Sequence, residues 1–227
     1  MGWLRNAMIG AVVVVAAGAS MVATRPPVAE ATATDASRTD VRVAVVGDSL
    51  SAGRSRFLGN GLDDESWMTY ANGDGIEFAG GWARSGATPD EMAAAVQPVR
   101  NVDVLVVLAG TNAVRVGRTV AQEEQAYRTI ARVVGAREVI VSALPPYDWK
   151  AAEALRYNRE LQRFATNSGW TWVDPWVFAR SGNGWAAGVS VDGTHPAGPE
   201  QYQRLGESFR RIILEDVRTR APFRVGR

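Results

Sequence analysis

The sequence predicts an α/β protein built around a parallel sheet with helices on both faces. Five short, mainly apolar runs have the composition of strands, and each stops at glycine, proline or small residues. Between these runs lie segments with helical capping signals and helical periodicity. Because alternating strands and helices favour a parallel sheet covered on both sides, we expect a three-layer α/β/α sandwich with five parallel strands.

The order of elements along the chain follows from these signals. The expected strands are 41–46, 76–79, 102–108, 139–143 and 171–173. A capping box with proline at the first helical position opens a helix at 88–96, and a second cap opens one from Thr119 to Gly135. Helices are also expected at 149–168 and from Pro199 onward. Residues 51–75 lack clear periodicity, so we expect a loop there with one helix around 65–70.

The N-terminus has the composition of a targeting segment. Arg5 precedes an almost wholly apolar run from Ala7 to Ala23, and Ala29-Glu30-Ala31 fits a signal-peptidase site. We expect residues 1–31 to be a secretory signal, and the alternative is an uncleaved anchor. Residues 32–40 are interpreted as a linker and 41–227 as one domain. The expected location is secreted or associated with the cell envelope.

Composition excludes several functional classes. The chain has no cysteine and one histidine, which excludes thiol nucleophiles, Cys-ligated metals and multi-histidine metal sites. We expect no cofactor and no metal. Removing residues 1–31 takes away two arginines and one glutamate, and the remaining formal net charge is zero. A neutral chain gives no support for nucleic-acid binding. We expect a monomer. An exported protein could also associate transiently with the membrane or the cell envelope.

The single histidine, His195, is the natural candidate for acid–base chemistry near neutral pH, because the pKa of imidazole is about 6.5. Asp192 lies three residues earlier, across a turn that contains Gly193. A carboxylate at that spacing can orient the Nδ1–H and leave Nε2 free to take a proton from a nucleophile. The alternative is a structural histidine beside a proline turn, with Asp192 capping that turn.

Further candidates follow the other strands. Ser49 comes after the first strand, Gly86 after the second and Asn112 after the third. Since the carboxyl ends of parallel strands share one edge, these residues should meet Asp192 and His195 there. Ser49 is then the nucleophile, and its own N–H, the N–H of Gly86 and the side-chain amide of Asn112 are donors for an oxyanion. Taken singly, Gly86 could permit a turn and Asn112 could be a cap.

Other polar residues in these loops are interpreted as structural. Asp48 is expected to organise its loop as a hydrogen-bond acceptor, and Asp174 to begin a turn with Pro175. Ser51, Ser55, Ser85 and Ser190 are not expected to be nucleophiles.

The strings Gly47-Asp48-Ser49-Leu50, Gly86, Gly110-Thr111-Asn112 and Asp192-Gly193-Thr194-His195-Pro196 resemble the blocks of the SGNH (GDSL) hydrolase family. The resemblance extends over residues 41–215. It implies a flavodoxin-like sandwich and a cofactor-free esterase, lipase or thioesterase. By motif, Ser49, Asp192 and His195 form the triad, and Ser49, Gly86 and Asn112 form the oxyanion hole.

The expected function is a secreted serine esterase acting on small-molecule, lipid or acylated-glycan esters. An acyltransferase using the same residues and a non-catalytic envelope-binding protein remain alternatives. Trp82, Trp176 and Trp185 lie in or near the loops of the expected site. They could line an acyl pocket or stack on a sugar, and the alternative is ordinary packing of aromatic side chains.

Overall fold

The computed structural model describes residues 40–53, 58 and 62–220. The expected signal 1–31, nearly all of the expected linker and Ser55 lie outside the described residues. Within the part of the chain that is described, no helix combines the length and apolar character needed to cross a membrane.

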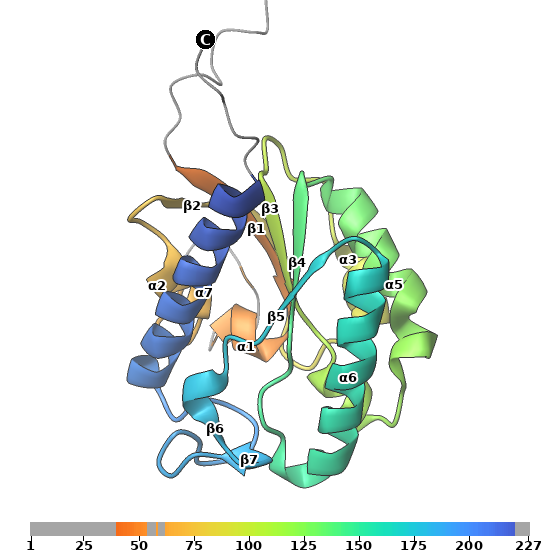
Figure 1. The fold of residues 1–227 in the computed structure, drawn as a ribbon, viewed down its shortest axis with the longest axis vertical. Helices are drawn as coiled ribbons and strands as arrows, with labels where there is room; N and C mark the ends of the chain where they lie inside the picture. The colour runs from red at the N-terminus through yellow and green to blue at the C-terminus, as the bar shows by residue number, and fades with distance from the viewer. Residues whose placement is uncertain (1–39, 54–57, 59–61, 221–227) are drawn as a thin grey trace, which may run out of the picture. The chain divides into compact units, whose positions relative to one another are not determined.

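A five-stranded parallel sheet forms the centre of the fold, as predicted (Figure 1). The spatial order is β2-β1-β3-β4-β5, which is the flavodoxin-like order implied by the resemblance. The bounds are β1 Val41–Gly47, β2 Ile76–Ala83, β3 Val104–Leu108, β4 Glu138–Ser142 and β5 Thr171–Val173.

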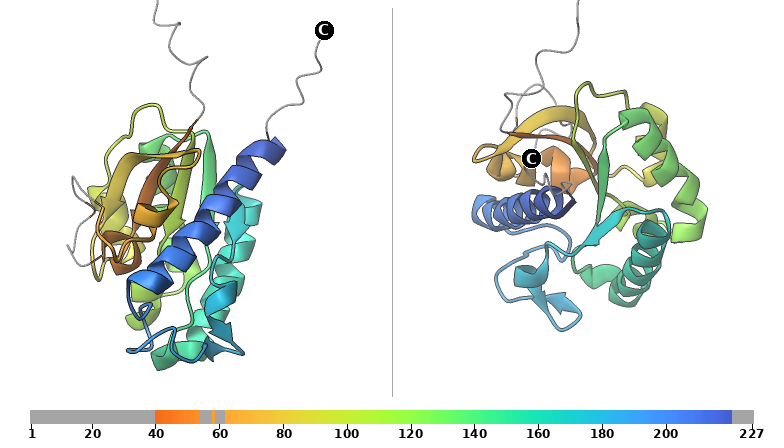
Figure 2. Two further views of the ribbon diagram at one scale, coloured as in Figure 1. Left: turned by 90° about the vertical axis from the view of Figure 1, so that its left-hand side faces the viewer. Right: turned by 45° about the horizontal axis from the view of Figure 1, so that its top comes forward.

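Helices cover both faces of the sheet, which gives the three layers visible in Figure 2. One layer holds α1 Ser49–Ala52, α2 Trp67–Ala71 and α7 Pro199–Arg220, and the other holds α3 Pro89–Ala95, α5 Val120–Val134 and α6 Ala151–Asn167. Short elements lie in the connections: α4 Thr111–Arg115, η2 Asp148–Lys150, η3 Val177–Ala179, and the pair β6 Arg180–Ser181 and β7 Gly184–Trp185.

The alternation of side chains along each strand divides the core into two clusters. Val43 and Val45 of β1 pack with α2 and α7, whereas Ala44 and Val46 pack with α3, α5 and α6. These four side chains are completely buried. A strand buried on both faces has no polar side to show water, and this explains the continuous apolar run in the sequence.

The helix boundaries follow the capping residues in the sequence. Thr88 and Glu91 form the expected capping box of α3, and Thr119 forms the corresponding box of α5. Gly135 ends α5 in a left-handed conformation with φ 72°, as the C-cap position requires. The expected helix at 149–168 is observed as η2 followed by α6.

The structure corrects the expected end of β2. The sequence predicts that this strand stops at Ala79, but it continues to Ala83 through Gly80 and Gly81. A Cβ on Gly81 would lie 1.9 Å from the carbonyl oxygen of Val45, so glycine is what allows the two strands to approach here. The glycine pair therefore extends the pairing instead of ending it. The short elements α1, α4 and β6–β7 were also not predicted.

The loops that follow the strands gather at the lower end of the view in Figure 1. β1 and β3 run parallel, but the order of strand addition reverses at β1, because β2 pairs with one edge of β1 and β3 with the other. In sheets of this kind, ligands bind beyond the carboxyl ends of the strands at such a switch point. Ser49 and Asn112 follow the two strands that flank it.

Candidate active site

Ser49 is the first residue of α1, and only Asp48 separates it from the end of β1. Asp48 caps this short helix, because its Oδ1 accepts a hydrogen bond of 3.1 Å from the N–H of Leu50. The strand can turn so sharply because Gly47 carries no side chain. A Cβ there would lie 2.5 Å from Ser51 Oγ and 2.8 Å from the carbonyl oxygen of Leu108. The turn leaves the Ser49 hydroxyl at the carboxyl edge of the sheet.

Ser49, His195 and Asp192 form a continuous hydrogen-bonded chain. Ser49 Oγ lies 2.8 Å from His195 Nε2, across 146 positions of sequence. His195 Nδ1 lies 2.7 Å from Asp192 Oδ2. The structure therefore brings together the three side chains that the sequence predicts as a triad.

Asp192 also organises the turn that carries the histidine. Its Oδ1 accepts hydrogen bonds from the N–H groups of Thr194 at 2.8 Å and His195 at 2.7 Å. One oxygen thus holds the backbone and the other holds the ring. The two sequence interpretations of Asp192, as a turn cap and as the partner of His195, are both met in the structure.

The charge of Asp192 sets the tautomer of the imidazole. Partial burial opposes ionisation, but hydrogen bonds from the ring of His195 and from the N–H groups of His195 and Thr194 outweigh it and lower the pKa of Asp192. The carboxylate is therefore ionised at neutral pH and can only accept a hydrogen bond. It holds the proton on Nδ1, so Nε2 of the neutral ring accepts the hydroxyl hydrogen of Ser49.

The expected oxyanion donors line one pocket with Ser49. Gly86 lies in the loop after β2, with φ 80° and open space where a Cβ would be. Asn112 is in α4, after β3, and its Nδ2 donates a hydrogen bond of 3.3 Å to Asp48 Oδ2. Asn112 Oδ1 accepts one of 3.1 Å from Arg115 Nε. These two bonds fix the amide orientation and leave one N–H of Nδ2 for a ligand.

Asp48 is the buried charge of the site. Its side chain is 1% exposed, and its two oxygens accept from Leu50 N–H and Asn112. Burial raises the pKa of Asp48 to about 6, against the opposing effects of these hydrogen bonds and of the nearby His195. The sequence interpretation of Asp48 as a loop-organising acceptor agrees with these bonds, but its burial and its bond to Asn112 were not foreseen.

A pocket of about 570 Å³ opens beside Ser49, and we call it the Ser49 pocket. Its walls come from the loops after β1, β2, β3 and β4 and from the loop that carries His195. The lining residues are Asp48, Ser49, Leu50, Ser85, Gly86, Thr111, Asn112, Arg115, Tyr147, Trp149, Thr194 and His195.

Sequence reasoning missed Arg115, Tyr147 and Trp149 in this pocket. All three lie in segments that follow β3 or β4, so the rule that located Ser49 and Asn112 would have covered them as well. Trp149 is 71% exposed, and its indole Nε1 donates a hydrogen bond of 3.0 Å to the carbonyl oxygen of Asp192. Trp149 therefore supports the turn that holds the aspartate and histidine.

The tryptophans singled out from the sequence serve packing instead. Trp176 is fully buried, donates to the carbonyl oxygen of Ala143 and packs edge-to-face with Trp185 at 6.0 Å between ring centroids. Trp82 packs against the core layer of α3 and α5. For these three tryptophans, the structure therefore supports ordinary aromatic packing and not a role in lining the pocket.

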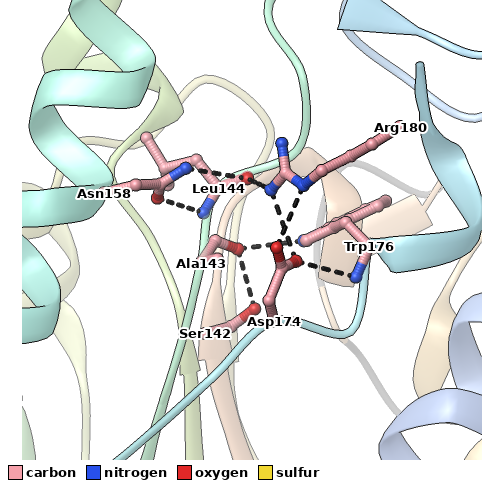
Figure 3. Close-up of polar contacts among 7 residues, drawn as sticks. All are labelled: Ser142, Ala143, Leu144, Asn158, Asp174, Trp176 and Arg180. Atoms are coloured by element: carbon pink, nitrogen blue, oxygen red, sulfur yellow. Dashed lines mark hydrogen bonds and ion pairs between the residues drawn. The ribbon is translucent and has the colours of Figure 1, made fainter. Parts of the chain in front are cut away.

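A polar network fixes the loops after β4 and β5 (Figure 3). Asn158 of α6 accepts from the N–H of Leu144 at 2.7 Å and donates to its carbonyl oxygen at 3.2 Å. Arg180 donates to the same carbonyl oxygen at 2.7 Å and to Asp174 at 3.0 Å. Asp174 is thus a structural residue, as interpreted from the sequence. The network holds the backbone that leads from β4 to Tyr147 and Trp149.

The sequence matches the model of a known protein family. Residues 45–200, more than half of the chain, match the model of the GDSL-like lipase/acylhydrolase family. The chain belongs to this family. The matched range contains the Ser49 turn, Gly86, Asn112 and the segment from Asp192 to His195, so the family resemblance noted in the sequence is confirmed.

Solved structures of GDSL proteins share this fold at low sequence identity. A lipolytic G-D-S-L family protein from Desulfitobacterium hafniense aligns with a TM-score of 0.61 and 14% identity, over 76% of this chain and 99% of that one. A GDSL-like lipase from Bacteroides thetaiotaomicron gives 0.57 and 17%, over 77% and 88%. A carbohydrate esterase family 3 protein from Talaromyces cellulolyticus gives 0.53 and 17%, over 79% and 99%. A comparison with curated proteins finds no match.

Proposed function

We propose that this GDSL-family protein is a serine esterase that hydrolyses carboxylic esters through an acyl-enzyme on Ser49. The observation that carries the proposal is the hydrogen-bonded chain from Ser49 Oγ through the His195 ring to Asp192. A nucleophile, a base and a group that orients the base are in reach of one another beside a pocket. A binding protein on the same fold would have no need of that chain.

In the first half of the reaction, Ser49 Oγ attacks the ester carbonyl carbon while His195 Nε2 takes the hydroxyl proton. The carbonyl oxygen becomes negatively charged, and the N–H groups of Ser49 and Gly86 and the free N–H of Asn112 Nδ2 stabilise it. Asp192 stabilises the imidazolium that forms. Collapse of the tetrahedral intermediate breaks the ester C–O bond, and His195 returns the proton to the departing alcohol.

In the second half, water attacks the acyl group on Ser49. His195 now takes a proton from the water, the same donors hold the second oxyanion, and the bond to Ser49 breaks as His195 returns the proton to the serine oxygen. The products are a carboxylic acid and the free enzyme. No redox partner and no metal ion takes part in this sequence of steps.

The substrate class that we propose is a lipid ester or an acylated glycan met outside the cytoplasm. The signal-like composition of residues 1–31 supports the location. The solved neighbours described as a lipase and as a carbohydrate esterase are consistent with either substrate. Esters of graded acyl length separate the two, because a preference for acetyl favours glycan deacetylation and one for long chains favours lipids.

The test is hydrolysis of 4-nitrophenyl acetate, butyrate and octanoate by the purified protein. We expect turnover by the wild type, and a loss in kcat of at least about 10³-fold in Ser49→Ala and in His195→Ala, because the nucleophile and base act as a unit. Ser208→Ala on α7 is the matched control and should keep wild-type rates. A folded wild type that leaves every ester intact would contradict the proposal.

The acyltransferase alternative is tested in the same assay. An alcohol acceptor such as glycerol is added while the acid and the new ester are both quantified. An esterase releases mainly acid, because water resolves the acyl-enzyme, whereas a transferase releases mainly the new ester.

A further inference from the structure

The wall of the Ser49 pocket carries one exposed cationic side chain. Three of the lining residues have acidic or basic side chains: Asp48, Arg115 and His195. Asp48 is buried and its oxygens are occupied by Leu50 N–H and Asn112. His195 is held by Ser49 and Asp192. Arg115 is therefore the charge in this wall that remains available to a bound molecule.

Arg115 makes only part of the hydrogen bonds that it can make. Its Nε donates to Asn112 Oδ1 at 3.1 Å, and this bond anchors the stem beside the expected oxyanion donor. Its two terminal nitrogens, Nη1 and Nη2, have no partner among the described residues. These nitrogens carry four N–H donors and share a full positive charge.

Several other arginines in the described part of the fold have carboxylate partners, whereas no described carboxylate pairs with Arg115. Arg118 pairs with Asp90 and Glu123, and Arg180 pairs with Asp174. The ammonium of Lys150 donates at 3.0 Å to the backbone carbonyl oxygen of Arg115. Among the described residues, no carboxylate lies within salt-bridge distance of the Arg115 guanidinium, so its charge is not paired inside the pocket wall.

We propose that Arg115 is a specificity-determining residue that binds an anionic group, a carboxylate or a phosphate, on the ester substrate. The inference rests on the proposed esterase function and narrows its substrate class to anionic esters. A guanidinium presents paired N–H donors that match the two oxygens of such a group, and these charge-assisted bonds are stronger than neutral ones. The anion could belong to the acyl part or to the alcohol part of the ester, and both would present the same chemistry to Arg115.

The test compares matched anionic and neutral esters. One pair carries the anion on the acyl part of the ester: mono-4-nitrophenyl adipate and the neutral methyl 4-nitrophenyl adipate. We call this pair the acyl arm. The other pair, the alcohol arm, carries the anion on the leaving alcohol part: 4-acetoxybenzoate and the neutral methyl 4-acetoxybenzoate. For each pair, the ratio of kcat/KM for the anionic ester to that for the neutral ester is measured in the wild type, in Arg115→Gln and in Arg115→Lys. Comparing ratios between variants cancels the intrinsic reactivity of each ester and any effect of the substitution on Asn112.

We expect Arg115→Gln to lower the ratio about tenfold in one of the two arms, as loss of a charge-assisted hydrogen bond predicts. Arg115→Lys should retain part of the preference, because it keeps the charge and loses the fork of donors. The arm that responds identifies the part of the substrate that carries the anion. Raising the ionic strength should shrink the wild-type ratio and leave that of Arg115→Gln unchanged.

Arg156→Gln is the matched control, because it removes the same charge from the neighbouring pocket formed around Lys150 and Glu160. It should leave both ratios at the wild-type value. Ratios that are the same in Arg115→Gln and wild type in both arms, with the neutral esters still hydrolysed, would overturn this inference while the esterase function stands. A folded wild type that hydrolyses neither the anionic nor the neutral esters would instead contradict the proposed function.

Discussion

At the scale of single residues, Asp48 links the nucleophile turn to the expected oxyanion donor. One of its oxygens caps α1 through Leu50 N–H, and the other accepts from Asn112 Nδ2. Arg115 holds the opposite end of the Asn112 amide. The two partners therefore decide which way the amide points, and Asp48 is a positioning residue for the donor.

The substitution Asp48→Asn should lower kcat for ester hydrolysis on the order of 10²-fold, the typical effect of losing one oxyanion donor. The new amide has one oxygen where the carboxylate has two, so it cannot accept from both Leu50 and Asn112. Asn112 must then give up its orientation or its bond. An increase in KM with kcat unchanged would contradict this role.

The same variant tests the charge state of Asp48 through stability. Burial raises the pKa of Asp48 to about 6 in the folded protein, above its ordinary value near 3.8. The folded state therefore binds the proton more tightly, and the free energy of unfolding falls as pH rises from about 4 to 6. This loss, at most roughly 3 kcal/mol, should be missing in Asp48→Asn. Urea denaturation of both proteins at pH 4, 5, 6 and 7 measures it, and parallel stability profiles would show that the carboxyl is not perturbed.

The sequence was sufficient to place the candidate site residues but not to describe their surroundings. Ser49, Gly86, Asn112, Asp192 and His195 each lie in a segment after a recognisable strand or in a recognisable motif. The burial of Asp48 and its bond to Asn112 depend on which loops pack together. That information lies in the tertiary contacts, which local patterns do not contain.

At the scale of elements, α7 and α2 determine how the layer nearest Ser49 packs. Gly206 of α7 meets α2 so closely that a Cβ would lie 2.5 Å from the carbonyl oxygen of Trp67 and 2.6 Å from Cβ of Tyr70. Trp67 also stacks on Phe209, with 4.1 Å between ring centroids. The contact between the two helices therefore has no room for another carbon atom.

We expect Gly206→Ala to lower the free energy of unfolding by about 1–3 kcal/mol, because the added methyl group forces α7 away from α2. In a helix without this neighbour, replacing glycine with alanine would raise the free energy of unfolding by about 1 kcal/mol. The sign of the change therefore shows whether α2 packs against Gly206 as closely as the structure indicates. Arg211→Ala, at an exposed position of α7, serves as the control and should stay within about 0.5 kcal/mol of the wild type. Chemical denaturation of the three proteins gives the comparison, and a stabilised Gly206→Ala would refute the close packing.

Elements with several turns or a clear apolar run were predictable, and short ones were not. α3 and α5 carry capping boxes, and the ends predicted from them are the ends observed. α1 and α4 have four and five residues, too few to show a helical period. The extra length of β2 escaped prediction because glycines usually end strands, and only the neighbouring strand reveals why these two are needed.

At the scale of the whole molecule, the strand order determines where the chemistry lies. Because β1, β2 and β3 are parallel, the segments that follow them lie at one edge of the sheet, and the position of β1 between the other two makes these segments neighbours. The residues alone predicted a parallel sheet with two helical layers, whereas the order of strands came from the family resemblance. Periodicity and capping describe each element separately and carry no information about which strands become neighbours.

The folded chain brings Ser49 and His195 within hydrogen-bonding distance although they are far apart in sequence. The turn after β1 carries the serine, and the loop before α7 carries the histidine. The proposed mechanism depends on this meeting, because the nucleophile must lie beside both its base and the oxyanion donors.

The most direct measurement is labelling of the purified protein with a fluorophosphonate probe, followed by intact mass and peptide mapping. We expect one probe per chain, attached to Ser49, and strongly reduced labelling in His195→Ala because the hydroxyl is activated by the imidazole. A folded wild type that takes up no probe, or that carries it on a different residue, would contradict the account.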